Sequence, residues 1–184
     1  MAIIVVGGSA KSVGKTALVC GLIAALPEHQ WTAVKITTHD HGKAESLWEE
    51  TEAGQGTDTA RYLAAGAVRA FLVTSHDGTD SALEIQQAVA PGTDLIIESN
   101  RILIQFKPDL CLGVLRPEGV AAEVKPSFQP FMLRADALVT VAAAGSSAGP
   151  AGRAIPVFRL ARLEHPSPEL LAWVRERLLL ASHS

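Results

Sequence analysis

The chain has few cysteines, few aromatic residues and no excess of positive charge. Its 184 residues include only two cysteines, Cys20 and Cys111, and both lie in apolar runs. This pattern predicts small core residues rather than a disulfide or a metal pair. The net charge of −3 gives no electrostatic reason to bind nucleic acid, because domains that do so usually carry a basic patch. We therefore expect no nucleic-acid partner.

Long apolar runs are also missing. No segment approaches the ~20 apolar residues that cross a bilayer, and Met1 leads directly into a short apolar run without a charged region before it. We expect no membrane partner and a cytoplasmic location. A hydrophobic content of 48% with 19% charged residues is typical of a globular protein rather than a disordered one. The length predicts a single domain over residues 1–184.

Apolar runs alternate with helix-forming stretches along the chain. The expected strands are 2–6, 31–37, 68–73, 94–98, 109–115, 137–142 and 155–160, and the expected helices are 17–26, 58–65, 81–89 and 167–180. A short helix from Ile102 and another in the second half of 125–134, which contains two prolines, complete the pattern. We expect a long connection over 42–57 with one helical turn at 46–50, and a flexible loop at 143–152. The alternation predicts an α/β fold of three layers with a mainly parallel sheet.

Residues 8–16 form the most informative motif. They read Gly-Ser-Ala-Lys-Ser-Val-Gly-Lys-Thr between the first strand and the first helix. Such a loop binds phosphate because several backbone N–H groups and the positive end of the helix dipole point at one anion. Lys15 is expected to reach the β- and γ-phosphates, and the Thr16 hydroxyl to complete the coordination of a Mg²⁺ ion. The predicted nucleotide contacts are Gly8, Ser12, Val13, Gly14, Lys15, Thr16 and Ala17.

The loop is one residue longer than the strict pattern G-x-x-x-x-G-K-[ST], because its first glycine is Gly8 and position 9 is serine. In this it resembles the loop of dethiobiotin synthetase, G-T-D-T-x-V-G-K-T. The resemblance implies an ATP-dependent ligase or kinase, with Lys11 and Lys35 holding a carboxylate or carbamate near the γ-phosphate. The guanine-reading tetrapeptide Asn-Lys-x-Asp is absent from the sequence. Both GTP and ATP are therefore retained as candidate nucleotides.

Acidic residues stand at the ends of two expected elements near this loop. Parallel sheets bind ligands beyond the carboxyl ends of their strands, and Glu98 ends a buried strand there, where it would hold Mg²⁺ directly or through water. Asp58 is either a second acid in the Mg²⁺ shell or the cap of its helix, a role for which Thr57 also qualifies. Asp94, at the opposite end of the Glu98 strand, is expected at the surface.

The second strand is followed by His39, Asp40 and His41. In an extended segment the two histidines point to the same side. They are candidates for metal ligands, for an anion-binding pair, for an acid/base pair or for a solvated turn. A metallochaperone-like GTPase that uses these histidines is one of the alternative functions. His76 and Asp77 are expected in a solvated loop.

Several of these segments together resemble molybdopterin-guanine dinucleotide biosynthesis protein B, the MobB-like P-loop proteins. The segments are Val34-Lys35-Ile36-Thr37-Thr38-His39-Asp40-His41, the helix that follows Thr57 and ends in Ala65-Gly66-Ala67, and the strand-end Glu98. They span about the first hundred residues. Ser99 and Asn100 stand where the family has a glycine turn.

This resemblance implies a GTP-binding, dimeric protein that assists an enzyme of molybdenum-cofactor biosynthesis. It carries Lys15 and Thr16 over as nucleotide and Mg²⁺ contacts, and places Lys35, His39, Asp58 and Glu98 at the active end of the sheet. Our leading hypothesis is Mg²⁺-dependent binding and slow hydrolysis of GTP or ATP in molybdopterin-guanine dinucleotide formation, with Lys15, Lys35 and Glu98 as catalytic residues. The broad apolar face of the helix at 167–180 predicts packing on the sheet or against a second subunit.

Overall fold

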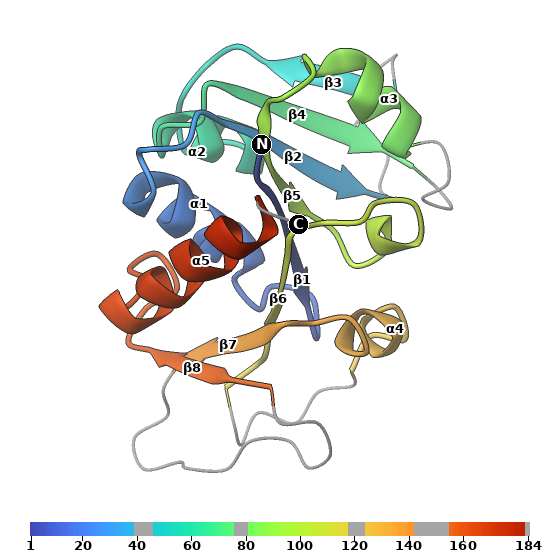
Figure 1. Cartoon of the computed structure of the whole chain (residues 1–184). Coiled ribbons are helices and arrows are strands. Elements are labelled where there is room, and N and C mark those ends of the chain that lie inside the picture. The colour runs from blue at the N-terminus through green and yellow to red at the C-terminus, as the bar shows by residue number, and fades with distance from the viewer. Residues whose placement is uncertain (39–45, 76–80, 118–123, 142–154, 183–184) are drawn as a thin grey trace.

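The computed structural model describes residues 1–38, 46–75, 81–117, 124–141 and 155–182, and within them it shows one eight-stranded sheet (Figure 1). The strand order is β3-β4-β2-β5-β1-β6-β7-β8. All neighbouring strands are parallel except β3 and β4. The strands are β1 (Ile3–Gly8), β2 (Trp31–Thr37), β3 (Leu47–Glu50), β4 (Arg69–Thr74), β5 (Asp94–Glu98), β6 (Leu110–Val114), β7 (Ala137–Val141) and β8 (Val157–Leu160). The predictions for His39, Asp40, His41, His76, Asp77 and 143–152 lie outside the described residues.

Helices cover both faces of this sheet. They are α1 (Lys15–Ala25), α2 (Asp58–Ala64), α3 (Ser81–Ala88), α4 (Phe128–Met132) and α5 (Pro168–Ala181), with a 3₁₀ helix at Ile102–Ile104. Helices α1, α2 and α5 contribute to the core on one face, and α3, the 3₁₀ helix and α4 contribute to the core on the other. The predicted three-layer α/β fold with a mainly parallel sheet is confirmed.

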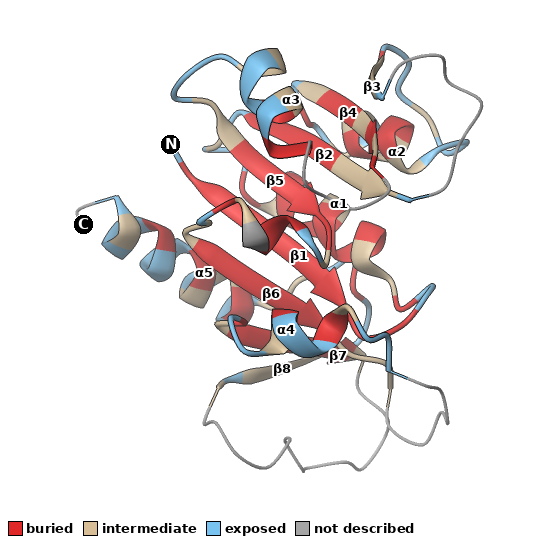
Figure 2. Cartoon of the chain, turned by 90° about the vertical axis from the view of Figure 1, so that its right-hand side faces the viewer, coloured by how far each residue is buried: buried red, intermediate tan, exposed pale blue. Residues whose placement is uncertain are grey.

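The central strand β1 lies between the two cores. Ile4 and Val6 belong to the core under α1 and α5, and Ile3 and Val5 belong to the opposite core. Successive side chains of a strand point to opposite faces, so a continuous apolar run such as this one is buried on both sides, as Figure 2 shows. Each such side chain contributes about 1.5–3 kcal/mol through burial. The strand that leads into the phosphate-loop motif is thereby fixed in place.

The segment at 46–50 is a strand, and the prediction of a helical turn there was wrong. β3 pairs antiparallel with β4, with Leu47 opposite Val73 and Glu50 opposite Ala70. The partly buried Leu47 packs against the core, and the buried Glu50 accepts a hydrogen bond of 2.8 Å from the Thr57 hydroxyl. The segment takes this form because β4 offers an unpaired edge, which local composition does not reveal.

Asp94 begins β5 and is partly exposed, as expected, but it is also a structural residue. Its Oδ1 accepts a hydrogen bond from the backbone N–H of Ala2 at 2.6 Å, and its Oδ2 lies 2.9 Å from Nδ1 of His29. Asp109 accepts similarly from the N–H of Ile3 at 2.8 Å. These carboxylates tie the amino end of β1 to the starts of β5 and β6.

The helix predicted for the second half of 125–134 begins earlier than expected. α4 starts at Phe128 and includes Pro130 as its third residue. Proline is tolerated there because the first N–H groups of a helix have no acceptor within the helix. This short helix places Phe128 and Phe131 in the core beside β1.

The last helix packs on the sheet of its own chain. Ser167 caps it, since its side chain accepts a hydrogen bond from the N–H of Leu170, and Pro168 is its first residue. Leu170, Val174 and Leu178 are buried in the core that α1 also covers. Of the two predicted packing modes, the intramolecular one is therefore confirmed for these three residues. Within the described residues, no helix has the length and apolar character needed to cross a membrane.

Both cysteines have free thiols, and both pack in or against the core, as predicted. Cys111 is buried, and Cys20 is partly buried against the core. Burial raises the pKa of the Cys111 thiol to about 12, so this thiol stays protonated and behaves as a small apolar side chain.

Candidate functional site

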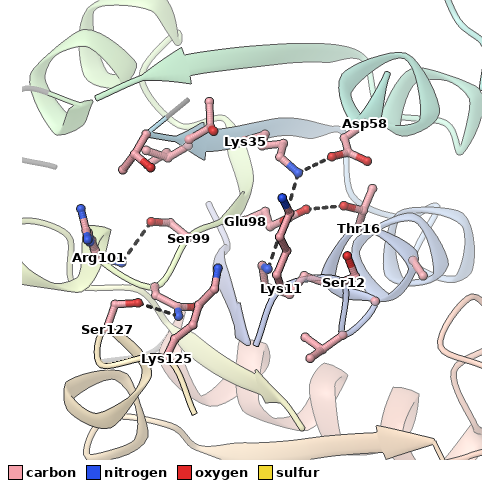
Figure 3. A pocket seen from close by; sticks show the side chains of 18 of the residues that line it. Lys11, Ser12, Thr16, Lys35, Asp58, Glu98, Ser99, Arg101, Lys125 and Ser127 are labelled. Atoms are coloured by element: carbon pink, nitrogen blue, oxygen red, sulfur yellow. Dashed lines mark hydrogen bonds and ion pairs between the residues drawn. The ribbon is translucent and has the colours of Figure 1, made fainter. Parts of the chain in front are cut away.

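A cavity of about 810 Å³ lies at the carboxyl ends of β1, β2 and β5 (Figure 3). One wall is the segment 11–17, which is the end of the loop after β1 and the first turn of α1. The other walls are the ends of β2 and β5 and the segment 125–127. The residues predicted as nucleotide contacts line it from Ser12 to Ala17, whereas Gly8 lies at the base of the loop and does not line the cavity. The position agrees with the rule that parallel sheets bind ligands beyond their carboxyl ends.

The loop takes a conformation that depends on Gly14. This residue precedes α1 and has a φ of 93°, in the left-handed region that L side chains rarely adopt. A Cβ atom on Gly14 would also lie 2.4 Å from Cδ1 of Leu163. Gly14 therefore allows α1 to begin at Lys15 with its first N–H groups and its positive dipole end at the cavity.

The side chain of Asn100 forms two hydrogen bonds to the backbone at the start of the loop, a role that we did not predict. Its Oδ1 accepts a hydrogen bond from the N–H of Gly8 at 2.7 Å, and its Nδ2 donates to the carbonyl of Gly8 at 3.0 Å. The Nδ2 also lies 3.2 Å from Oγ of Ser127. The position of Asn100, two residues after the strand-end Glu98, was the available signal. This residue stands where the resemblance implied a glycine turn, and it binds the loop through its side chain.

Glu98 is the centre of the polar cluster in the cavity. It is 4% exposed, and its Oε2 accepts hydrogen bonds from the hydroxyls of Thr16 at 2.7 Å and Tyr62 at 2.6 Å. Its Oε1 lies 3.3 Å from the ammonium of Lys35 and 3.6 Å from that of Lys15. The structure thus brings together four predicted site residues, Lys15, Thr16, Lys35 and Glu98, from three separate parts of the sequence.

Asp58 joins this cluster through Lys35. The two side chains form an ion pair (Figure 3). The Asp58 carboxylate also lies 3.6 Å from Nη1 of Arg61. The cap of α2 is Thr57, whose hydroxyl accepts from the N–H of Ala60, so of the two predicted caps the threonine is correct. The side chain of Asp58 is therefore directed to the cavity cluster rather than used as a cap.

Each charged group of the cluster stabilises the ionised form of its neighbours. Burial alone would raise the pKa of Glu98, but the ammonium groups of Lys35 and Lys15 and the two hydroxyl donors hold it below its ordinary value. Burial alone would lower the pKa of Lys35, but Glu98 and Asp58 raise it. Burial likewise opposes ionisation of Asp58, and the Lys35 ammonium outweighs it and lowers the pKa. At neutral pH Glu98 and Asp58 are therefore ionised, and Lys35 is protonated.

The oxygen atoms of the cluster fit a Mg²⁺ ion that is also bound to phosphate. Thr16 donates its hydroxyl proton to Glu98, which leaves the lone pairs of the hydroxyl oxygen directed elsewhere. Hydroxyl and carboxylate oxygens are the hard ligands that Mg²⁺ prefers. The described residues contain no group of three or more His, Cys, Asp or Glu side chains placed to hold a metal ion. Thr16, with Glu98 and Asp58 nearby, would thus hold Mg²⁺ only together with phosphate oxygens.

Tyr62 is a second residue that sequence reasoning missed. It is fully buried in α2, and its hydroxyl donates to Glu98. Burial and the Glu98 charge raise the pKa of Tyr62 well above its ordinary value, so it remains a neutral donor. An aromatic residue in a helix has the sequence pattern of a core residue, and no further signal in the sequence marks this role.

Replacing Tyr62 with phenylalanine should lower the free energy of unfolding by about 2 kcal/mol, because a buried carboxylate loses one of its two hydroxyl donors. Urea unfolding at neutral pH measures the change. Thr140→Val is a matched control, since it removes another buried hydroxyl that does not contact the cluster. Equal losses of unfolding free energy in the two variants would show that the hydrogen bond from Tyr62 to Glu98 stabilises the protein no more than an ordinary buried hydroxyl does.

Basic side chains predominate around the cavity, although the chain as a whole carries a net charge of −3. Three of its lining residues are acidic, namely Asp58, Glu98 and Glu164, and six are basic, namely Lys11, Lys15, Lys35, Arg61, Arg101 and Lys125. Arg101 and Lys125 were not among the predicted site residues. Their segments carry no phosphate-loop signal, and only the fold brings them to the loop.

Comparison with known proteins gives evidence on the fold. No protein-family model matches the chain, and no curated protein matches it. Among solved structures the chain is similar to LpxK from Aquifex aeolicus, whose structure was solved in complex with ATP. The TM-score is 0.55 with 20% sequence identity, over 86% of this chain and 53% of LpxK, so this chain spans about half the length of that protein. Together with the strand, loop and helix around Gly8 to Thr16, this likeness shows a three-layer α/β fold of the P-loop NTPase type.

Proposed function

We propose that this chain binds a Mg²⁺–nucleoside triphosphate, ATP or GTP, against residues 12–17 and hydrolyses it slowly. The observation that carries the proposal is the convergence of Lys15, Thr16, Lys35 and Glu98 at the amino end of α1. A polyphosphate placed there would meet the N–H groups of the loop, the helix dipole and the Lys15 ammonium. The LpxK structure in complex with ATP supports the same type of ligand for this fold.

The residues of this site are suited to phosphoryl transfer to water. In that reaction the γ-phosphorus forms a bond to the water oxygen, and its bond to the β–γ bridging oxygen breaks. The reaction needs positioning and charge neutralisation more than covalent chemistry. Lys15 would neutralise the phosphates, while Glu98, kept ionised by its neighbours, orients Thr16 and the two ammonium groups. A bound Mg²⁺ would supply further neutralisation of the β- and γ-phosphates.

A nucleotide panel tests this proposal. We expect Mg²⁺–ATP or Mg²⁺–GTP at saturating concentration to raise the melting temperature, because a ligand at about 100 times its Kd stabilises the folded state by about 2.7 kcal/mol. The corresponding diphosphates and metal-free triphosphates should raise it less. The panel also decides between the two bases. If neither triphosphate shifts the transition in the presence of Mg²⁺, the proposed function is wrong.

A role in molybdenum-cofactor biosynthesis, beside an enzyme that forms molybdopterin-guanine dinucleotide, is the more specific proposal. Its support is the MobB-like pattern, because Lys35, Asp58 and Glu98, which that resemblance places at the active end, meet in one cluster. Adding the purified protein to a reconstituted dinucleotide-forming reaction is the direct test. The predicted homodimer would be checked by light scattering on the same sample.

An ATP-dependent kinase or ligase is the second candidate function. The observation in its favour is that the cavity continues beyond the loop to Arg101 and Lys125, where a second substrate would have room. Release of ADP that increases when a second substrate is added would support it.

A metallochaperone-like GTPase stays a prediction, because His39 and His41 lie outside the described residues. Elemental analysis of the purified protein tests it.

A further inference from the structure

The cavity is larger than a site for a triphosphate chain alone requires. Its volume of about 810 Å³ lies in the ~300–1,000 Å³ range of pockets that enclose whole small molecules. The segment 11–17 forms only one wall. The wall away from Thr16 and Asp58 contains Arg101, Lys125 and Ser127, which are grouped together in Figure 3.

Backbone contacts fix the segments that carry these two basic residues. The N–H of Lys125 donates to the carbonyl of Ser9 at 2.8 Å, which joins its segment to the phosphate loop. The N–H of Arg101 donates to Oγ of Ser99 at 3.1 Å, directly after β5. Asn100, which precedes Arg101, also contacts Gly8 and Ser127, so the segments of both cations are joined to the start of the loop.

Two of the three acidic residues that line the cavity, Glu98 and Asp58, already have partners. Glu98 is bound by Thr16, Tyr62 and lysines, and Asp58 is bound by Lys35 and Arg61. Lys125 has no ion pair among the residues that the structure places. Lys125 is exposed, but the protein atoms around it reduce its hydration, and this effect and then the positive charges of Lys15 and Lys11 lower its pKa. Positive charge is thus concentrated at this wall, and the Glu98 carboxylate offsets its effect on Lys125 only in part.

We propose that Lys125 and Arg101 form a subsite for an oxyanion, a phosphate or carboxylate group, on a second substrate that binds opposite the triphosphate. This inference rests on the proposed nucleotide site and deepens it by assigning the chemical class of the second substrate. Two cations on different segments suit an anion with several oxygen atoms, because each forms a charge-assisted hydrogen bond to a different oxygen.

The test measures inorganic phosphate binding to protein saturated with a Mg²⁺ complex of a non-hydrolysable triphosphate, so that the γ-phosphate position is filled. Isothermal titration calorimetry should show a second, weak site in the wild type. Lys125→Ala and Arg101→Ala should each weaken phosphate binding about tenfold or more, because each removes a hydrogen bond to a charged group. Affinity for the triphosphate should change less than about threefold. Malonate in place of phosphate shows whether carboxylates occupy the same subsite.

Lys107→Ala is the matched control, since Lys107 is exposed and does not line the cavity. If the wild type binds the triphosphate but neither phosphate nor malonate, or if the two variants bind them as the wild type does, the subsite proposal is wrong. A parallel loss of triphosphate affinity would also overturn it, because the two cations would then belong to the triphosphate site. If the wild type does not bind the triphosphate, the proposed function itself fails, which is a separate result.

Discussion

The Lys15→Ala variant is expected to lose triphosphate affinity by a factor on the order of a hundred or more, because it removes the partly buried ammonium group that would face the β- and γ-phosphates in the proposed complex. The Lys15 side chain is 17% exposed, and its Nζ lies 3.6 Å from Oε1 of Glu98. Salt screens the charge of such a partly buried ammonium group only weakly, so water and dissolved ions replace it poorly when it is removed. Calorimetric titration with the Mg²⁺–triphosphate measures the loss.

The fold of this variant should be retained. Glu98 keeps the Lys35 ammonium at 3.3 Å and both hydroxyl donors, so its charge remains compensated. Circular dichroism and thermal unfolding of Lys15→Ala should therefore resemble those of Lys107→Ala, an exposed lysine variant outside the cavity. Tight triphosphate binding by a folded Lys15→Ala protein would contradict the assignment of the phosphate loop.

The Glu98→Gln variant is expected to show the second large effect, a fall in triphosphatase rate on the order of a hundredfold. An uncharged amide in place of the carboxylate leaves Lys15 and Lys35 without their shared counter-charge and weakens the acceptor of the Thr16 hydroxyl. The free energy of unfolding should also fall by about 3 kcal/mol, as when one partner of a buried ion pair is removed. Phosphate release and urea unfolding measure the two changes.

The same substitution should make stability less sensitive to acid. The pKa of Glu98 in the folded state lies below its ordinary value of 4.5, so its ionisation stabilises the protein above that pH, and the contribution is lost as the pH falls through the lower value. On acidification from about pH 6 to about pH 3, Glu98→Gln should thus lose less stability than the wild type. Glu176→Gln, on an exposed position of α5, is the control and should follow the wild type. An acid response of Glu98→Gln that matches the wild type would exclude this role for the carboxylate.

The parts of the site that the sequence revealed belong to local patterns, in which each residue is recognised from its neighbours in the chain. The phosphate-loop motif could be recognised with the elements on both sides of it, because an apolar strand, a glycine-containing loop and a helix follow one another from Ile3 to Ala25. Glu98 was found because it ends a continuous apolar strand, and the rule for parallel sheets places such ends beside the loop. These inferences need only local periodicity and one general rule of topology.

Only the tertiary structure decided which side chains support these residues. Asn100 binds Gly8 across 92 positions, and Tyr62 binds Glu98 across 36. The strand β3 exists because β4 has a free edge, and Lys125 faces the cavity because its segment is hydrogen-bonded to Ser9. The physical reason is that these contacts join residues far apart in the chain, and a polar or aromatic side chain has no local pattern that identifies its distant partner.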